Sequence, residues 1–469
     1  MTGVLLWSAF VTAAVAWLRA TCERRFRSYD PARDQHYDFT GSDVEVFDVA
    51  VDQGGFRWPE TASSWDTAHL SLRVESTVLG RIADPRIDAA VTDLVTRHYL
   101  ERGGRGLRLL NLSGLRGANA LRKGDHVALR GTCATWPAQS ARLHLCSTAL
   151  PPRPRVLVLA SHPDDAEIAA FGLYARSDAF VVTITAGDHA GFYLDRARRV
   201  AELGASAAQH ARVWDSITVP FFGGVPPERC VNLGYGDSTL AGLFENRTSG
   251  VTHSARRIAE HRGVNLSPLT PASPEDPNWA ALIADLVHVM REIQPDVIVM
   301  PHPLLDDHPD HAFTTLAACE ALATADLDCG QLLLYVNHSP RSSLYPFGQN
   351  DGAVPPPPHF GEPVPFRTIF SEPLSTEARE LKFLALEAMH DLRTLPADDP
   401  PSWTRLVRTA LSALRGKISG RGRTPTSYFR RAVRPNELFF ALPFSDAPLL
   451  REQFITAWKA GRVRWHVCP

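Results

Sequence analysis

Two short clusters of histidine and carboxylate side chains stand far apart in the chain. They are Ser161-His162-Pro163-Asp164-Asp165 and Asp307-His308-Pro309-Asp310-His311. Each cluster follows an apolar run typical of a buried strand, residues 156–160 before the first and residues 297–300 before the second. In an open α/β sheet, ligands bind just beyond the carboxyl ends of the strands, so the two clusters can meet in one pocket.

The residue types suit a hydrolytic metal centre. Catalytic zinc takes three protein ligands and leaves one position for water or substrate, and we expect His162, Asp165 and His311 to be these ligands. The metal lowers the pKa of its water to about 7, so the adjacent carboxylate of Asp164 can complete the deprotonation as general base. His308 is then placed to stabilise the oxyanion, to protonate the leaving amine, or both. The competing interpretation of the first cluster is structural, with an Asp capping a helix N-terminus.

The two clusters resemble those of the PIG-L-like (LmbE-like) zinc-dependent N-deacetylases, which remove acetyl from N-acetylglucosamine groups. The family pattern is a strand ending in A/S-H-P-D-D, followed much later by P-H-P and D-x-H-P-D-H. Residues 160–165 and 301–311 meet it. The resemblance implies the same metal ligands, with Zn²⁺ or another divalent metal such as Fe²⁺ as cofactor, and the same roles for Asp164 as base and His308 as oxyanion partner.

Weaker matches imply the contacts to the sugar. Arg199 begins a stretch that looks like the family's R-x-x-E helix, and Asp237 lies in a stretch that looks like its segment with a sugar-contacting Asp. An ordinary helix-face cation and an exposed turn carboxylate would explain these residues equally well, and Arg196 and Arg198 compete for the first role. The family's C-terminal signature, K-x-x-A-L-x-x-H, is met only loosely from Lys382 onward.

Residues 153–395 show strands alternating with helices, which predicts an α/β fold with a Rossmann-like, mainly parallel sheet. Strands are expected at 156–160, 180–185, near Ile217, 297–300 and 332–336, and helices from Glu167 and over 195–210, 278–292 and 312–322. No G-x-G-x-x-G follows the first strand, so nothing supports a dinucleotide site. The proline-rich stretch 337–372 is expected to be a loop, either one that shapes the substrate pocket or a disordered one.

Residues 38–150 are predicted to form a smaller β-sandwich-like accessory domain, because short apolar runs alternate with turn residues there. A helix over 88–101 is expected to interrupt the strands. Trp58, Trp65, Trp136 and Tyr99 could line a glycan-binding surface or belong to the core. The prolines of residues 151–154 mark the boundary to the deacetylase-like domain.

Both ends of the chain carry possible membrane signals. Residues 1–30 hold an apolar run followed by positive charges, which indicates a membrane anchor with the catalytic domain on the cytoplasmic side. A cleaved signal peptide, implying a secreted or periplasmic protein, and a buried helix are the alternatives. The extension 396–469 begins with a basic stretch without acidic residues between 400 and 436. Its apolar residues recur at helical spacing between Trp403 and Ile418, so this segment could lie on a membrane surface or pack on the core.

The length of 469 residues predicts two or three domains, and the net charge of -2 argues against a nucleic-acid partner. Together with the resemblance, these features predict a zinc-dependent hydrolase that removes acetyl from a GlcNAc-type amino sugar. The sugar would belong to a glycolipid, a glycan or a related conjugate, lipid-linked or polymeric. The alternatives are a non-catalytic glycan-binding or scaffolding protein on a degenerate deacetylase fold, and a zinc amidohydrolase acting on a different amide.

Overall fold

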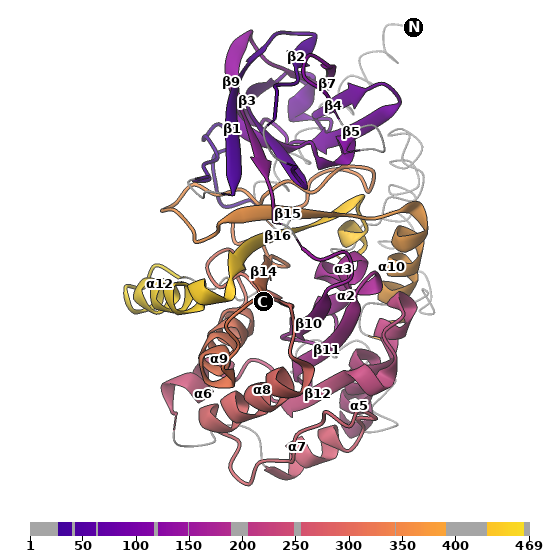
Figure 1. Ribbon diagram of the computed structural model, residues 1–469, viewed down its shortest axis with the longest axis vertical. Helices are drawn as coiled ribbons and strands as arrows, with labels where there is room; N and C mark the ends of the chain where they lie inside the picture. The colour runs from indigo at the N-terminus through magenta and orange to yellow at the C-terminus, as the bar shows by residue number, and fades with distance from the viewer. Residues whose placement is uncertain are drawn as a thin grey trace, which may run out of the picture.

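The computed structural model describes most of the chain as an α/β half with a strand-rich region packed on one end of it (Figure 1). The described residues are 27–39, 43–61, 64–116, 121–148, 150–188, 205–247, 255–342, 344–390 and 429–463. The apolar run of the predicted N-terminal anchor, the predicted sugar contact Arg199 and the predicted amphipathic segment 403–418 lie outside these ranges. Among the described residues, no helix combines the length and apolar character needed to cross a membrane.

The α/β half is built on one seven-stranded sheet with the order β12-β11-β10-β13-β14-β16-β15. Its strands are β10 (Arg155–Ala160), β11 (Asp178–Thr185), β12 (Cys230–Tyr235), β13 (Val297–Pro301), β14 (Gln331–Tyr335), β15 (Thr368–Pro373) and β16 (Asn436–Pro443). Strands β10 to β14 are parallel, whereas β16 runs antiparallel to both β14 and β15. The predicted α/β class is confirmed, with β16 as the one described strand of this sheet that runs against the others.

Helices cover both faces of this sheet. They are α2 (Asp165–Ala169), α3 (Phe171–Ala175), α5 (Ala205–Thr218), α6 (Leu240–Glu245), α7 (Ala255–Arg262), α8 (Trp279–Ile293), α9 (Pro309–Ala325), α10 (Thr376–Ala388) and α12 (Ala447–Lys459). Successive side chains of a strand point to opposite faces, so Leu157 and Leu159 of β10 pack with α8 and α9, whereas Val156 and Val158 pack with α3, α5 and α10. This two-sided burial explains why β10 is an unbroken apolar run.

The strand-rich region consists of two antiparallel sheets around one core. The first contains β1 (Val44–Val51), β3 (Thr67–Ser76), β6 (Arg105–Asn111), β8 (Ala134–Thr135) and β9 (Gln139–Cys146), and the second β2 (Gly55–Arg57), β4 (Arg86–Val91), β5 (Leu94–Tyr99) and β7 (His126–Thr132). Side chains from both sheets share a single hydrophobic cluster. Trp58, Trp136 and Tyr99 are buried, with 1%, 7% and 5% of their surface exposed, and Trp65 is partly buried and packs against this cluster, so these aromatic side chains contribute to the interior.

Two predicted elements are wrong. Residues 88–101 form no helix: β4 and β5 pair as a hairpin in which Val91 faces Leu94. Thr92 takes a positive φ of 48°, as a tight two-residue hairpin turn requires. The predicted strand near Ile217 is part of α5, where Val213 and Ile217, four residues apart, are both buried on one helix face.

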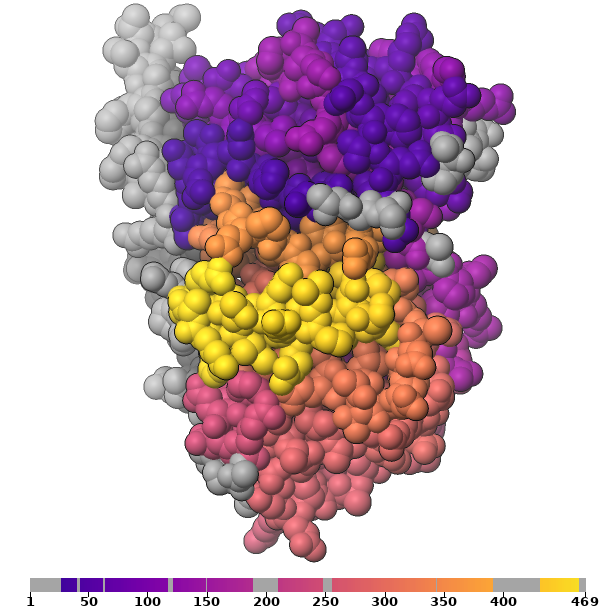
Figure 2. All heavy atoms as spheres, turned by 60° about the vertical axis from the view of Figure 1, so that its left-hand side comes forward, coloured from indigo at the N-terminus to yellow at the C-terminus, as the bar shows by residue number. Residues whose placement is uncertain are grey.

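The proline-rich stretch lies between the two halves of the molecule. Figure 2 shows it, in orange, together with the yellow C-terminal elements, as a band between the strand-rich region and the helical layer. Residues of the strand-rich side hold it: the Asn111 side chain donates to the Val354 carbonyl at 2.9 Å, and the Tyr99 hydroxyl donates to the Asp351 carboxylate at 3.0 Å. The Tyr37 hydroxyl donates to the Pro357 carbonyl at 2.6 Å. The stretch is therefore an ordered connection that ends in β15.

Three histidines are buried in the strand-rich region. His69 of β3 faces His144 of β9 across the sheet, and His98 lies on β5. Burial lowers the pKa of His69 to about 3 and the pKa values of His98 and His144 to about 4. The folded region therefore holds all three rings neutral, although a histidine in an unfolded chain has a pKa of about 6.5.

We expect this region to unfold in mild acid. Because the folded-state pKa values are depressed, the full stability is present above about pH 6.5 and is lost as the pH falls toward 4, at about 1.4 kcal/mol per pH unit for each histidine. Urea unfolding between pH 7 and pH 4.5 measures how the free energy of unfolding changes with pH. Replacing His98 with Phe should make this change smaller, whereas replacing the exposed His126 with Gln should not. A flat profile would contradict the prediction.

Candidate metal centre

The two histidine-carboxylate clusters lie at the carboxyl ends of β10 and β13, which are neighbours in the sheet. The first cluster leads into α2 and the second into α9. As a result, Nε2 of His311 lies 3.3 Å from Nδ1 of His162, although the two residues are 149 positions apart. The predicted convergence of the two motifs is what the structure shows.

Three side-chain atoms form what we call the ligand triangle: His162 Nδ1, Asp165 Oδ2 and His311 Nε2. The carboxylate oxygen lies 3.3 Å from His162 Nδ1 and 3.0 Å from His311 Nε2. Ligands at about 2.0–2.2 Å from a tetrahedral Zn²⁺ stand about 3.3 Å from one another. The separations and the nitrogen and oxygen donor set therefore fit one zinc-sized cation.

Further buried side chains orient two of these ligands. Nδ1 of His311 lies 3.0 Å from the Asp306 carboxylate, so a carboxylate stands behind the histidine in the manner usual for metal-bound imidazoles. The Asn337 side chain donates at 2.8 Å to the other oxygen of Asp165. These contacts fix the ring and the carboxylate before any ion arrives.

Two other carboxylates face the far side of His162. Its Nε2 lies 3.4 Å from Asp310 Oδ2 and 3.5 Å from Asp237 Oδ1. Asp310 in turn accepts hydrogen bonds from the backbone amides of Ser238 at 2.6 Å and Leu240 at 3.2 Å. Asp237, predicted as a sugar contact, is thus brought to the centre, where it faces a predicted metal ligand.

The electrostatics of the site favour a cation between the rings. Burial alone would lower the pKa of His311, but Asp165 and Asp306 raise it to about 10. Burial opposes charge on His162 as well, yet Asp237, Asp165 and Asp310 raise its pKa well above the usual value. Burial would raise the pKa of Asp165, and the two histidines lower it well below its usual value. A divalent ion would supply the positive charge that these carboxylates attract.

Asp164 and His308 stand beside the triangle. Asp164 occupies the N-cap position of α2, but its side chain makes no capping hydrogen bond, contrary to the structural interpretation of this residue. The ring centroid of His308 lies 4.5 Å from that of His162. Burial, together with His162 and His311, lowers the pKa of His308 to about 2, so this ring is neutral and keeps an N–H to donate.

Residues 157–322 match the family model described as PIG-L: GlcNAc-PI de-N-acetylase. The chain carries a PIG-L-family domain. A search of curated proteins finds no match.

Two solved structures show limited likeness to the chain. GalB, the 4-carboxy-2-hydroxymuconate hydratase from Pseudomonas putida KT2440, is 14% identical over 62% of this chain and 95% of its own, with a TM-score of 0.33. A family two carbohydrate esterase from Cellvibrio japonicus is 11% identical over 64% of this chain and 88% of its own, with a TM-score of 0.17.

Several side chains at the centre were missed by the sequence analysis. Asp306 lies inside the D-x-H-P-D-H pattern of the PIG-L domain but was given no role there. His338 follows the next parallel strand, β14, and its ring centroid lies 5.0 Å from that of His311. A histidine just beyond the carboxyl end of a neighbouring strand is a signal that could have found it. Arg212 of α5, 3.7 Å from Asp164, had no sequence signal at all.

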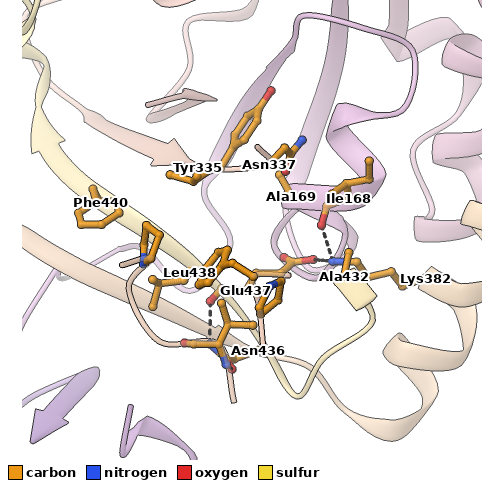
Figure 3. Close-up of a pocket in the computed structure, with 15 residues that line it drawn as sticks. Ile168, Ala169, Tyr335, Asn337, Lys382, Ala432, Asn436, Glu437, Leu438 and Phe440 are labelled. Carbon is orange, nitrogen blue, oxygen red and sulfur yellow. Dashed lines mark hydrogen bonds and ion pairs between the residues drawn. The ribbon is translucent and has the colours of Figure 1, made fainter. Parts of the chain in front are cut away.

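A cavity of about 60 Å³ lies between Asn337, Ile168, Lys382 and Glu437 (Figure 3). It is lined by α2, the end of β14, the proline-rich stretch, α10 and β16. Asn337, which donates to Asp165, forms part of its wall, so one side chain separates the cavity from a predicted ligand. Lys382 and Glu437 form an ion pair at 2.8 Å in the same wall. Asn337, Lys382 and Glu437 lie beyond the family match, so the chain outside residues 157–322 contributes to the surroundings of Asp165.

Proposed function

We propose that this protein is a zinc-dependent N-deacetylase that hydrolyses the acetamide of a GlcNAc-type amino sugar, on a Rossmann-like sheet. The observation that carries the proposal is the ligand triangle, whose three atoms come from two distant segments and stand 3.0–3.3 Å apart, with the carboxylate of Asp164 beside it. The match of residues 157–322 to a de-N-acetylase family model supports the same reaction class.

The side chains divide the chemistry as follows. His162, Asp165 and His311 would hold the metal, which supplies an acidified water and polarises the acetamide carbonyl when bound. Asp164 takes a proton from the attacking water. The new C–O bond gives a tetrahedral oxyanion, and the neutral His308 donates its N–H to it. Asp164 then returns the proton to the departing nitrogen as the C–N bond breaks, so acetamide and water give acetate and a free amine.

The organisation of the chain is part of the proposal. Residues 38–150 would be an accessory domain, because the buried members of their core lie only between Val49 and Leu145. Residues 153–395 would be the catalytic domain, with β16 and α12 of the extension 396–469 completing its sheet and helical layer. We also propose Arg199 and Asp237 as sugar contacts, and a glycolipid or glycan as the conjugate that carries the sugar.

The proposal is tested by acetate release. The protein is stripped of metal with a chelator, reloaded with Zn²⁺ or Fe²⁺, and assayed on lipid-linked and oligosaccharide N-acetylglucosamine conjugates, with N-acetyl amino acids as a second amide class. Metal-dependent release of equal amounts of acetate and free amine from the sugar conjugates is expected. Release from the amino acids alone would support a different amidohydrolase. Sugar binding without acetate release from any conjugate would support the glycan-binding alternative, which Asp164 argues against because binding needs no general base beside the metal.

Replacing His311 with Ala should abolish metal binding. This ring supplies one corner of the ligand triangle and is fully buried, so no surface side chain can replace it. Metal content after dialysis, measured by mass spectrometry, should fall from about one equivalent to background. The matched control is His288→Ala on the exposed face of α8, which should keep the wild-type content. One full equivalent in the His311 variant would rule out the triangle as the metal site.

A further inference from the structure

A buried guanidinium lies between two carboxylates at the edge of the proposed active site. Arg212 of α5 exposes 5% of its surface, and its Nη1 donates to the Gly187 carbonyl at 2.9 Å. Nη2 lies 3.7 Å from Asp164 Oδ1, and Nη1 lies 3.9 Å from Asp237 Oδ2. Arg212 therefore forms ion pairs with both the proposed base and a carboxylate that faces His162.

Gly187 makes the space that Arg212 occupies. Its φ is +65°, a conformation that side chains disfavour. A Cβ atom at this position would lie 2.6 Å from Nη1 of Arg212, 2.7 Å from its Cζ and 2.8 Å from Cδ of Pro163. Any side chain would thus collide with the guanidinium and with the proline of the first metal motif. The loop after β11 is shaped to bring this arginine against Pro163 and Asp164.

The distances indicate how the arginine acts. At 3.7 Å the guanidinium is too far from Asp164 for a good hydrogen bond, which needs about 2.7–3.2 Å between nitrogen and oxygen. At this separation in a buried site the attraction between opposite charges is still strong. Arg212 is also anchored elsewhere by Gly187, so it can attract one oxygen of Asp164 from a fixed position.

We propose that Arg212 is the positioning residue of the general base: it draws Oδ1 of Asp164 toward α5 and leaves Oδ2 directed at the attacking water. The inference deepens the proposed function and rests on it. It places beside the general base a positively charged side chain that belongs to neither sequence motif. The reaction is otherwise unchanged, because Arg212 neither gives nor takes a proton.

The test compares Arg212→Met, Arg212→Lys and Gly187→Ala with wild-type protein under acetate-release conditions. A misplaced base costs on the order of 100-fold in kcat, and we expect this loss for Arg212→Met with KM and metal content unchanged. Arg212→Lys should recover part of the loss, because it restores the charge. Gly187→Ala should reproduce the Arg212→Met defect by displacing the guanidinium. The control is Arg256→Met on α7, an arginine whose side chain is 87% exposed.

A double substitution separates this inference from the proposed function. In an Asp164→Asn background, adding Arg212→Met should cause no further loss of kcat, since both changes disable the same base. If the two substitutions lower kcat by the product of their separate effects, the positioning role is overturned. A fall in metal content that parallels the fall in kcat would overturn it as well. Full activity of Arg212→Met beside an inactive Asp164→Asn would also overturn it while leaving the function intact. Full activity of Asp164→Asn would overturn the hydrolytic mechanism itself.

Discussion

Asp164→Asn is expected to lower kcat on the order of 10²–10⁴-fold while the protein keeps its metal, because an amide cannot accept the proton that the attacking water must lose. The substitution conserves shape at a position with 9% of its surface exposed. It also leaves α2 intact, since the Asp164 side chain makes no capping hydrogen bond. The loss should therefore reflect the missing base and not a disrupted helix.

The comparison of metal content and rate decides whether Asp164 is the base. Zinc is measured in the same sample as kcat, and the far-ultraviolet circular dichroism spectrum checks the fold. Asp328→Asn, on an exposed loop of the α/β half, is the matched control and should behave as wild type. If Asp164→Asn loses its zinc, Asp164 is a ligand. If it keeps both zinc and full activity, another group takes the proton.

The convergence of the candidate ligands could be predicted from the sequence because these residues follow strands. His162 and His311 stand just beyond two apolar runs, and parallel strands that are neighbours in a sheet bring their carboxyl ends together. Nothing more than the strand pattern and the residue types was needed. The side chains behind the ligands were harder to predict: Asn337 reaches Asp165 only because β14 pairs with β13, a neighbour relation that the local sequence does not encode.

Arg212 could not be predicted for a different reason. Its position depends on the direction of α5 and on the positive φ of Gly187, two features that arise from tertiary packing. The hairpin of β4 and β5 illustrates the same limit in the fold. Its turn, Thr92-Asp93, lacks the Asn-Gly or Asp-Gly signal of most two-residue hairpins, so the run from Asp88 to Glu101 was misinterpreted as a helix.

The strand-rich region can influence the site through the proline-rich stretch. That stretch begins at Asn337 and His338, which contact Asp165 and His311, and continues to Asp351 and Val354, which the strand-rich region holds. Its middle is held from the other side by Arg434, which is fully buried and donates to backbone carbonyls between Pro346 and Gln349. Contacts made at both ends thus give the strand-rich region a physical connection to Asp165.

The ion pair of Lys382 and Glu437 is expected to be the most sensitive point for stability. Lys382 has no exposed surface, and its Nζ lies 2.8 Å from Glu437 and 2.8 Å from the Ile168 carbonyl at the end of α2. Glu437 accepts the backbone amides of Gly172 at 2.9 Å and Leu173 at 3.2 Å, in α3. The pair therefore joins α10 and β16 to the break between α2 and α3 (Figure 3).

Lys382→Met should reduce the free energy of unfolding by about 3–5 kcal/mol, because it leaves a buried carboxylate without its counter-charge. Urea unfolding at pH 7 measures the loss. Adding Glu437→Gln should recover much of it, since a neutral amide still accepts from Gly172 and no longer buries a charge. The exposed pair of Lys123 and Glu60 supplies the control, and Lys123→Met should leave unfolding unchanged. An equally small effect of Lys382→Met would show that the carboxylate is adequately stabilised by the amides of α3 alone.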